Sequence, residues 1–163
     1  MRGIFWELFF PPKCVLCKKV LSKEETDLCH DCREHQPVYT EHKIKLSFLA
    51  QWTGLWYYKE NVRSSILRYK FYGRRSYGQS FGRLLAMKLQ KDGWDDTDVF
   101  TWIPISRQRK FTRGYDQAEL LAKAAAEELG LEAVPTLRKI RNTKPQIHHG
   151  RCRPPAGKHP GRL

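Results

Sequence analysis

Four cysteines in two pairs are the residues of this 163-residue chain whose types and spacing point most directly to chemistry. They form Cys14-x-x-Cys17 and, eleven residues later, Cys29-x-x-Cys32. Each pair offers two thiolates on one side of a tight turn, so two such turns supply four soft ligands for a tetrahedral ion such as zinc. Because sulfur fills all four positions and leaves none for water, the predicted zinc is structural and not catalytic.

Two disulfides or four free thiols are the alternative states of these cysteines. The apolar residues 4–10 contain Glu7, stop at Pro11-Pro12 and lack a small-residue cleavage site, so we expect an amphipathic helix packed on its own protein and not a signal peptide. No stretch is long enough to span a membrane. A cytoplasmic location follows as an expectation, and disulfides rarely persist there. Zinc binding is therefore favoured over disulfides and free thiols, and His30 is expected to face solvent. The bound metal would supply stability that the small hydrophobic core of this module lacks.

A second stretch, residues 98–130, combines an apolar run with a cationic segment. The run at residues 99–103 breaks at Pro104, and a turn at Gly114 precedes a helix that starts near Gln117. The cations between them are Arg107, Arg109, Lys110 and Arg113. Since the first amides of a helix lack partners and carry partial positive charge, this order predicts a place for an anion. An ordinary strand-to-helix connection with solvated charges is the alternative, and the spacing does not decide between them.

The elements that position this stretch follow from its hydrophobic pattern. Residues 98–103 predict a strand covered on both faces, and residues 133–140 predict a second strand. Asp116 is expected to cap the helix between them and Gly130 to end it. The helix's predicted buried stripe consists of Leu120, Leu121, Ala124 and Leu129. Strand, helix and strand in this order imply a parallel crossover whose ligands bind beyond the carboxyl ends of the strands.

The middle of the chain alternates aromatic and basic residues. Residues 52–58 predict a strand, and two helices follow it, the second from about residue 77 to 91. Their apolar faces are Val62, Ile66, Leu67 and Phe71 in the first, and Phe81, Leu84, Leu85 and Leu89 in the second. Such a mixture occurs in single-strand nucleic-acid binding. The core-like periods of the rings favour the plainer interpretation, in which they are core and the charges are solvated.

The net charge of +13 is unevenly distributed. From Ala133 onward there are eight Lys or Arg residues and no Asp or Glu, so the first 132 residues carry only +5. Most of the excess belongs to the last part of the chain. It is therefore weak support for nucleic-acid binding by the folded part.

Two sequence segments form an ordered pattern: Ile103-Pro104-Ile105-Ser106 and Arg113-Gly114-Tyr115-Asp116-Gln117-Ala118. This pattern resembles the signature of the ComF family, the ComFC-type competence proteins that look like type I phosphoribosyltransferases. The Lys70-Phe71 pair and Gly73 are also similar to the family pattern. The apolar start, prolines and four cysteines of residues 9–32 follow the family's order, and the resemblance covers about residues 5–146.

The resemblance implies an α/β fold: an incomplete type I phosphoribosyltransferase-like parallel sheet with an N-terminal zinc-ribbon-like module. The expected divisions are 1–46 for the apolar segment and zinc module, 47–146 for the partial transferase-like domain and 147–163 for a basic tail. The loop that meets pyrophosphate in the family corresponds to Ile105, Ser106 and Arg107. The signature residues Arg113, Gly114, Tyr115, Asp116 and Gln117 receive no chemical step, and no catalytic residue is identified. Residues 138–146 correspond to the family's flexible loop.

After Gln146 the resemblance stops. The family continues to a strand with two acidic residues and a Thr/Gly-rich turn that holds phosphoribosyl pyrophosphate, whereas this chain has no acidic residue after Glu132. We expect C-terminal truncation by a reading-frame shift at this point. The alternative is a genuine, disordered basic tail that contains Cys152. Truncation would leave a parallel strand unpaired on one side, which would lower the stability of the protein. Binding of Mg²⁺ with phosphoribosyl pyrophosphate is expected only in a full-length member of the family.

The sequence thus predicts a ComF-family, phosphoribosyltransferase-like protein associated with competence and DNA uptake, inactive as it stands. Its expected partners are other competence proteins and single-stranded DNA. The alternatives are a small zinc-ribbon protein that binds single-stranded nucleic acid through its basic surface, and a fragment without function. The substrate that would accept a ribosyl group is not identified by any motif.

Overall fold

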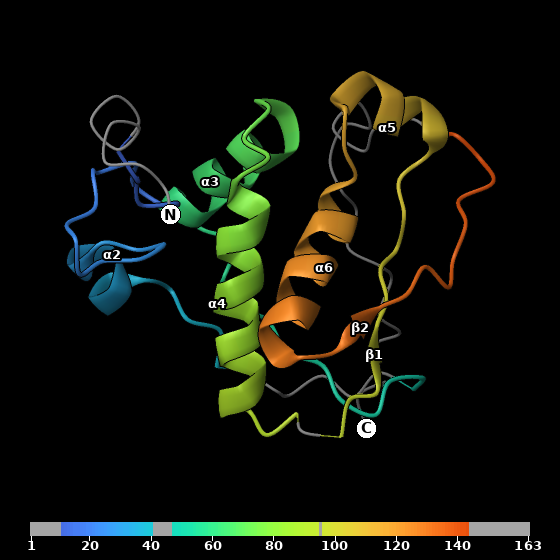
Figure 1. The fold of residues 1–163 in the computed structure, drawn as a ribbon, viewed down its shortest axis with the longest axis horizontal. Coiled ribbons are helices and arrows are strands. Elements are labelled where there is room, and N and C mark those ends of the chain that lie inside the picture. The colour runs from blue at the N-terminus through green and yellow to red at the C-terminus, as the bar shows by residue number, and fades with distance from the viewer. Residues whose placement is uncertain (1–10, 41–46, 95, 144–163) are drawn as a thin grey trace, which may run out of the picture.

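The computed structural model describes residues 11–40, 47–94 and 96–143 (Figure 1). Its helices are α2 (His30–His35), α3 (Glu60–Phe71), α4 (Tyr77–Lys91), α5 (Arg107–Arg113) and α6 (Gln117–Leu129), and its strands are β1 (Val99–Phe100) and β2 (Glu132–Ala133). Figure 1 shows α4 and α6 side by side, with the cysteine-bearing segment beyond α4 and the two strands beyond α6. None of these helices is long and apolar enough to cross a membrane. The predicted N-terminal amphipathic helix and the basic tail lie outside the described residues.

Helices α3 and α4 form where the apolar periods predict them. Phe81 and Leu89 of α4 are buried, and Val62 of α3 is buried against the same core. The prediction for Phe71 is wrong, since 47% of this side chain is exposed. Phe71 is the last residue of α3, and its ring lies under the guanidinium of Arg113, 5.0 Å from the ring centroid.

Helix α6 has the predicted ends and a different buried face. The Asp116 side chain accepts hydrogen bonds at its start, and Gly130 ends it in the left-handed conformation at φ 68°. Its buried residues are Gln117, Ala122, Ala125 and Ala126, whereas Leu120 and Leu121 are half-buried at the edge of the core. The shift has a steric cause: α4 approaches α6 so closely that only small side chains fit between them.

The predicted strands are shorter than their apolar runs. In residues 52–58 only Trp56 makes a bridge, to Val38. The rings of Trp52 and Tyr57 pack on Tyr39, with centroids 5.3 and 5.0 Å away. In residues 98–103 the ladder covers Val99–Phe100 alone, and 78% of Ile103 is exposed. The predicted strand covered on both faces is therefore wrong at this point.

The predicted parallel crossover is confirmed in a minimal form. β1 pairs in parallel with β2, with Val99 opposite Glu132 and Phe100 opposite Ala133, and α6 connects them. β2 stops before Pro135, which has no amide hydrogen to continue the ladder. The structure has the expected mixture of helices and parallel strands.

One hydrophobic core joins the cysteine segment to the helices. Its buried members include Cys14, Val15, Leu16, Leu21, Leu28, Cys29, Cys32, Val62, Tyr69, Phe81 and Tyr115. The predicted division between residues 46 and 47 stays a prediction. Across it, the described residues on both sides share buried contacts and are packed as one body.

The contact between α4 and α6 depends on Gly82. A Cβ atom there would lie 2.4 Å from the Cβ of Ala124 and 2.9 Å from the amide nitrogen of Ala125. We expect Gly82→Ala to lower the free energy of unfolding by about 1 to 3 kcal/mol, because overpacking outweighs the gain in helix propensity. Urea denaturation of the variant beside Gln90→Ala, an exposed position of α4, measures this. A Gly82→Ala protein as stable as the parent would contradict it.

Candidate functional site

The four cysteines form a compact group of sulfur atoms. Their Sγ atoms all lie within 4.8 Å of one another, and those of Cys17 and Cys29 are 3.6 Å apart. Tetrahedral zinc with Zn–S bonds of about 2.3 Å requires sulfurs about 3.8 Å apart, whereas a disulfide requires about 2.05 Å. All four cysteines are free, so the donor set fits a four-sulfur zinc site and the disulfide alternative is not realised. This group supports a structural zinc.

The local backbone explains how each pair presents its sulfurs. The amide of Lys18 donates to the carbonyl of Cys14 at 2.9 Å, and Lys18 takes a positive φ of 70°, which closes the first turn. The amide of Lys19 donates to the Sγ of Cys17 at 3.5 Å. Cys29 is the residue before α2, and Cys32 lies on that helix facing the group. His30 is exposed, as predicted.

Ionisation of all four thiols is unfavourable without a bound cation. Burial raises the pKa of Cys32, and the side chains of Cys17, Cys29 and Cys14 raise it further. Burial also raises the pKa of Cys17. For Cys14, burial opposes ionisation, but the amides of Cys17, Cys29 and Leu16 together bring the pKa below its ordinary value. A divalent cation would offset the repulsion among the remaining thiolates, so metal binding must release protons.

The cysteine turns are bonded to two helices of the main body. The Oγ of Ser65 on α3 donates to the carbonyl of Val15, and the Nη2 of Arg68 donates to the carbonyls of Val15 and Leu16 at 3.2 and 2.5 Å. On α4, Arg83 forms two hydrogen bonds to the carboxylate of Asp27, at 2.9 and 2.5 Å. The module is thus attached through backbone carbonyls and one ion pair.

At the other end of the molecule, Asp116 occupies the place predicted for an anion. Its Oδ1 accepts hydrogen bonds from the amides of Ala118 and Glu119 at 3.0 and 3.3 Å, and its Oδ2 accepts from the amide of Ile105 at 2.8 Å. The carboxylate therefore neutralises the start of α6 from within the chain. The predicted anion site at the first amides of α6 is wrong for this reason.

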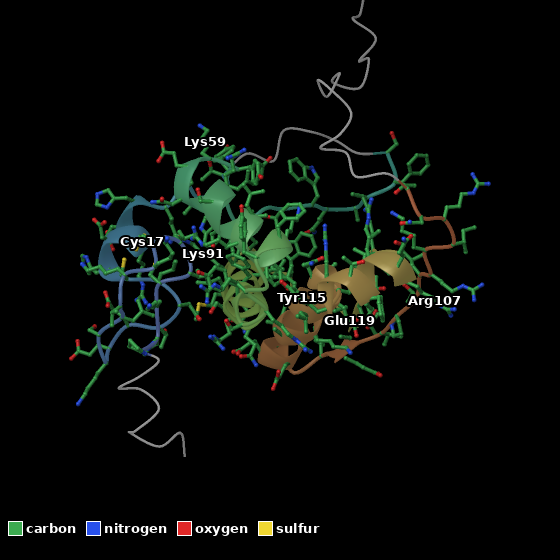
Figure 2. All side chains as sticks on the ribbon, turned by 90° about the horizontal axis from the view of Figure 1, so that it is seen from above. Cys17, Lys59, Lys91, Arg107, Tyr115 and Glu119 are labelled. Carbon is green, nitrogen blue, oxygen red and sulfur yellow. The ribbon has the colours of Figure 1, made fainter. Side chains whose placement is uncertain are left out.

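The predicted pyrophosphate candidates have three different surroundings. Ser106 is buried, caps the unpredicted helix α5 and donates to the Oδ1 of Asn142 at 2.8 Å. Ile105 is half-buried and lines a groove, whereas Arg107 is exposed and lines no part of it. Figure 2 shows Arg107 at the opposite end of the molecule from Cys17, with Tyr115 between them. A metal at the cysteines therefore cannot act on a ligand bound near Arg107.

The signature residues tie α3 to the start of α6. The hydroxyl of Tyr115 donates to the carbonyl of Tyr69, and the hydroxyl of Tyr69 donates to the carbonyl of Gln117 at 2.7 Å. Burial raises the pKa of Tyr69, and Tyr115 and Asp116 raise it further, so the donating hydroxyl is retained. Arg113 donates to the Oε1 of Gln117 at 2.9 Å. The contacts of Tyr115 and Gln117 hold the fold together in the described chain, and the ligand-binding assignments of the motif stay predictions.

The cations of the basic segment are mostly engaged. Lys110 pairs with Glu119 at 2.7 Å, and Arg109 donates to the carbonyl of Thr143. The carboxyl of Glu119 also bonds Lys123, and the two lysines lower its pKa. Of these four cations, only Arg107 has a side chain with no hydrogen bond, ion pair or ring contact to the described residues. This supports the alternative of solvated and locally paired charges for most of the segment.

A groove lies between α3, the start of α6 and residues 53–58. Its volume is about 1260 Å³. Five cationic residues line it, and no Asp or Glu does: Arg63, Lys70, Arg109, Arg113 and Lys139. Apolar and aromatic residues such as Trp56, Ile66, Phe71 and Leu121 form the rest of its wall. Sequence reasoning did not find the groove, because its walls come from four separated segments; the basic-aromatic alternation of residues 52–75 was the available signal.

The metal assignment predicts a stoichiometry and a pH dependence. We expect the parent chain to bind one zinc and Cys32→Ser to lose it, while Cys152→Ser retains it as a matched control. Zinc affinity should fall as the pH is lowered, because the raised pKa values of Cys17 and Cys32 mean that protons compete for both thiolates. Elemental analysis and titrations at several pH values measure both. Zinc retained by Cys32→Ser would refute the four-sulfur site.

Comparisons with known proteins agree with both parts of the sequence prediction. Residues 5–43 match the family model described as a double zinc ribbon domain. The chain is 27% identical over 136 residues to the competence protein ComFC of Bacillus subtilis (strain 168), and the match covers 75% of this chain and 57% of that relative. No solved structure matches the chain. The four-cysteine ribbon and the similarity to a competence protein both agree with the predicted resemblance to the ComF family.

Proposed function

We propose that this chain is a competence-associated protein with a phosphoribosyltransferase-like core stabilised by a zinc ribbon whose ligands are Cys14, Cys17, Cys29 and Cys32. The observation that carries the proposal is the similarity to a competence protein over 75% of the chain. The parallel β1–α6–β2 unit supports the transferase-like part, because ligands of such units bind near the strand ends. A cytoplasmic location stays a prediction.

We further infer that the chain does not by itself transfer a phosphoribosyl group. Transfer requires a held 5-phosphate, a metal-bound pyrophosphate and a positioned nucleophile. Asp116 already uses the amides of α6, Ser106 is bonded to Asn142, and the sequence has no acidic residue after Glu132 to carry Mg²⁺ in the family's manner. These features leave Ile105 and Arg107 as the remaining candidates near a pyrophosphate.

This inference predicts the result of a turnover assay. The purified zinc-loaded chain incubated with phosphoribosyl pyrophosphate and Mg²⁺ should release no more pyrophosphate than a protein-free blank. The same assay with Arg107→Ala serves as the matched control, since genuine turnover through the predicted loop would fall in that variant. Release that exceeds the blank and depends on Arg107 would overturn the inference.

A second candidate function, binding of single-stranded nucleic acid, is supported by the groove. Arg63 and Lys70 are exposed on α3, and with Arg109, Arg113 and Lys139 they give the groove five positive charges without a carboxylate. Phosphates of a single strand would be attracted by these cations, and bases stack on aromatic side chains such as those of Trp56 and Tyr58. The charges lie on the described fold, so this candidate does not depend on the basic residues 147–163.

The candidate predicts a change in salt dependence. Binding of a thymidine oligonucleotide should weaken in Arg63→Ala/Lys70→Ala, and the slope of log affinity against log salt should fall by about 1.4, because each lost phosphate contact removes about 0.7. The control variant, Lys23→Ala/Arg33→Ala, removes two exposed cations from the cysteine module, outside the groove, and should leave slope and affinity near those of the parent. Equal losses of oligonucleotide affinity in both double variants would indicate general charge attraction and would contradict binding in the groove.

A further inference from the structure

We propose that the cysteine module is a metal-dependent clamp that fixes the position of α3, and through it one wall of the groove. The groove's proposed ligand is not needed for this inference, although its importance for function rests on that proposal. The observation behind it is that the donors of two different helices are bonded to the short backbone segments that carry the metal ligands.

The first cysteine turn is bonded to α3. Val15 and Leu16 are the two residues between Cys14 and Cys17, so their carbonyls are oriented by the turn that a bound metal would close. Ser65 is fully buried, and its only described acceptor is the carbonyl of Val15. Opening of the turn would leave a buried hydroxyl without a partner, which costs free energy unless α3 moves.

The second cysteine turn is bonded to α4. Asp27 lies two residues before Cys29, its side chain is 6% exposed, and both of its carboxylate oxygens accept from Arg83. The carbonyl of Asp27 also accepts from the amide of Val15 at 2.8 Å, which joins the two turns to each other. A displacement of either turn therefore changes the acceptors of both helices.

The opposite face of α3 forms the groove wall. Ser65 and Arg68 point to the module, whereas Arg63, Ile66 and Lys70 of the same helix line the groove. The two sets lie on opposite faces of one rigid helix. If α3 rotates or shifts when its hydrogen bonds to the module's carbonyls are lost, the groove residues must therefore move as well. The metal centre thereby influences the groove without touching it.

Hydrogen–deuterium exchange of the full chain tests the clamp. On removal of zinc by a chelator, we expect amide exchange in α3 to rise by about tenfold or more, with a markedly smaller rise in α6, because local opening exposes the clamped helix first. Re-addition of zinc should reverse the change. Cys152→Ser should respond to the chelator as the parent does.

A second variant separates the clamp from general unfolding. Ser65→Ala/Arg68→Ala removes the α3 side chains that donate to the module and keeps all four cysteines. We therefore expect one bound zinc, faster exchange in α3 than in the zinc-loaded parent, and little further change in α3 when zinc is removed. Exchange that rises only in residues 13–35, or equally in α3 and α6, would overturn the clamp. None of these readouts involves nucleic acid or phosphoribosyl pyrophosphate, so failure of the clamp is distinguishable from failure of the proposed function.

Discussion

The close approach of α4 to α6 is the steric constraint on which the arrangement of the molecule depends. With no side chain at Gly82, the two helices touch through Ala124 and the backbone at Ala125. On one side of this pair, Arg83 of α4 reaches the cysteine module, and on the other, α6 connects the two parallel strands. Figure 1 shows this central pair between the cysteine-bearing segment and the two strands. A wider separation would displace the module and the strands relative to each other.

Much of the helical structure follows from local sequence rules, and the strands do not. Asp116 and Gly130 mark the ends of α6 because a carboxylate accepts amide hydrogen bonds and glycine adopts a positive φ without strain. The apolar period of α4 predicts both its bounds and the burial of Phe81 and Leu89. Strand length depends on pairing partners that are distant in sequence. In residues 52–58 the aromatic rings of Trp52 and Tyr57 pack on Tyr39, and composition alone does not distinguish such a ring cluster from a strand.

The two candidate sites differ in how much sequence could predict. Four cysteines with regular spacing carry their own geometry, and their sulfurs lie together as expected. The anion prediction for α6 failed because one residue, Asp116, had two possible roles: as a cap it uses the very amides that an external anion would need. The groove could not be predicted, since Trp56, Lys70, Arg113 and Lys139 come together only through tertiary packing. Rules based on neighbouring residues in the sequence do not predict which distant segments pack together.

Asp27 illustrates how few side chains one position of this fold can accept. Its backbone adopts a φ of 60°, a left-handed conformation that glycine, asparagine and aspartate tolerate better than other residues. Glycine would satisfy the backbone and supply no acceptor for Arg83; asparagine would offer one oxygen in place of two. Random mutagenesis of this codon should therefore yield almost exclusively weakened proteins, and a redesign of the chain would treat position 27 as fixed while varying exposed neighbours such as Lys23 and Thr26 freely.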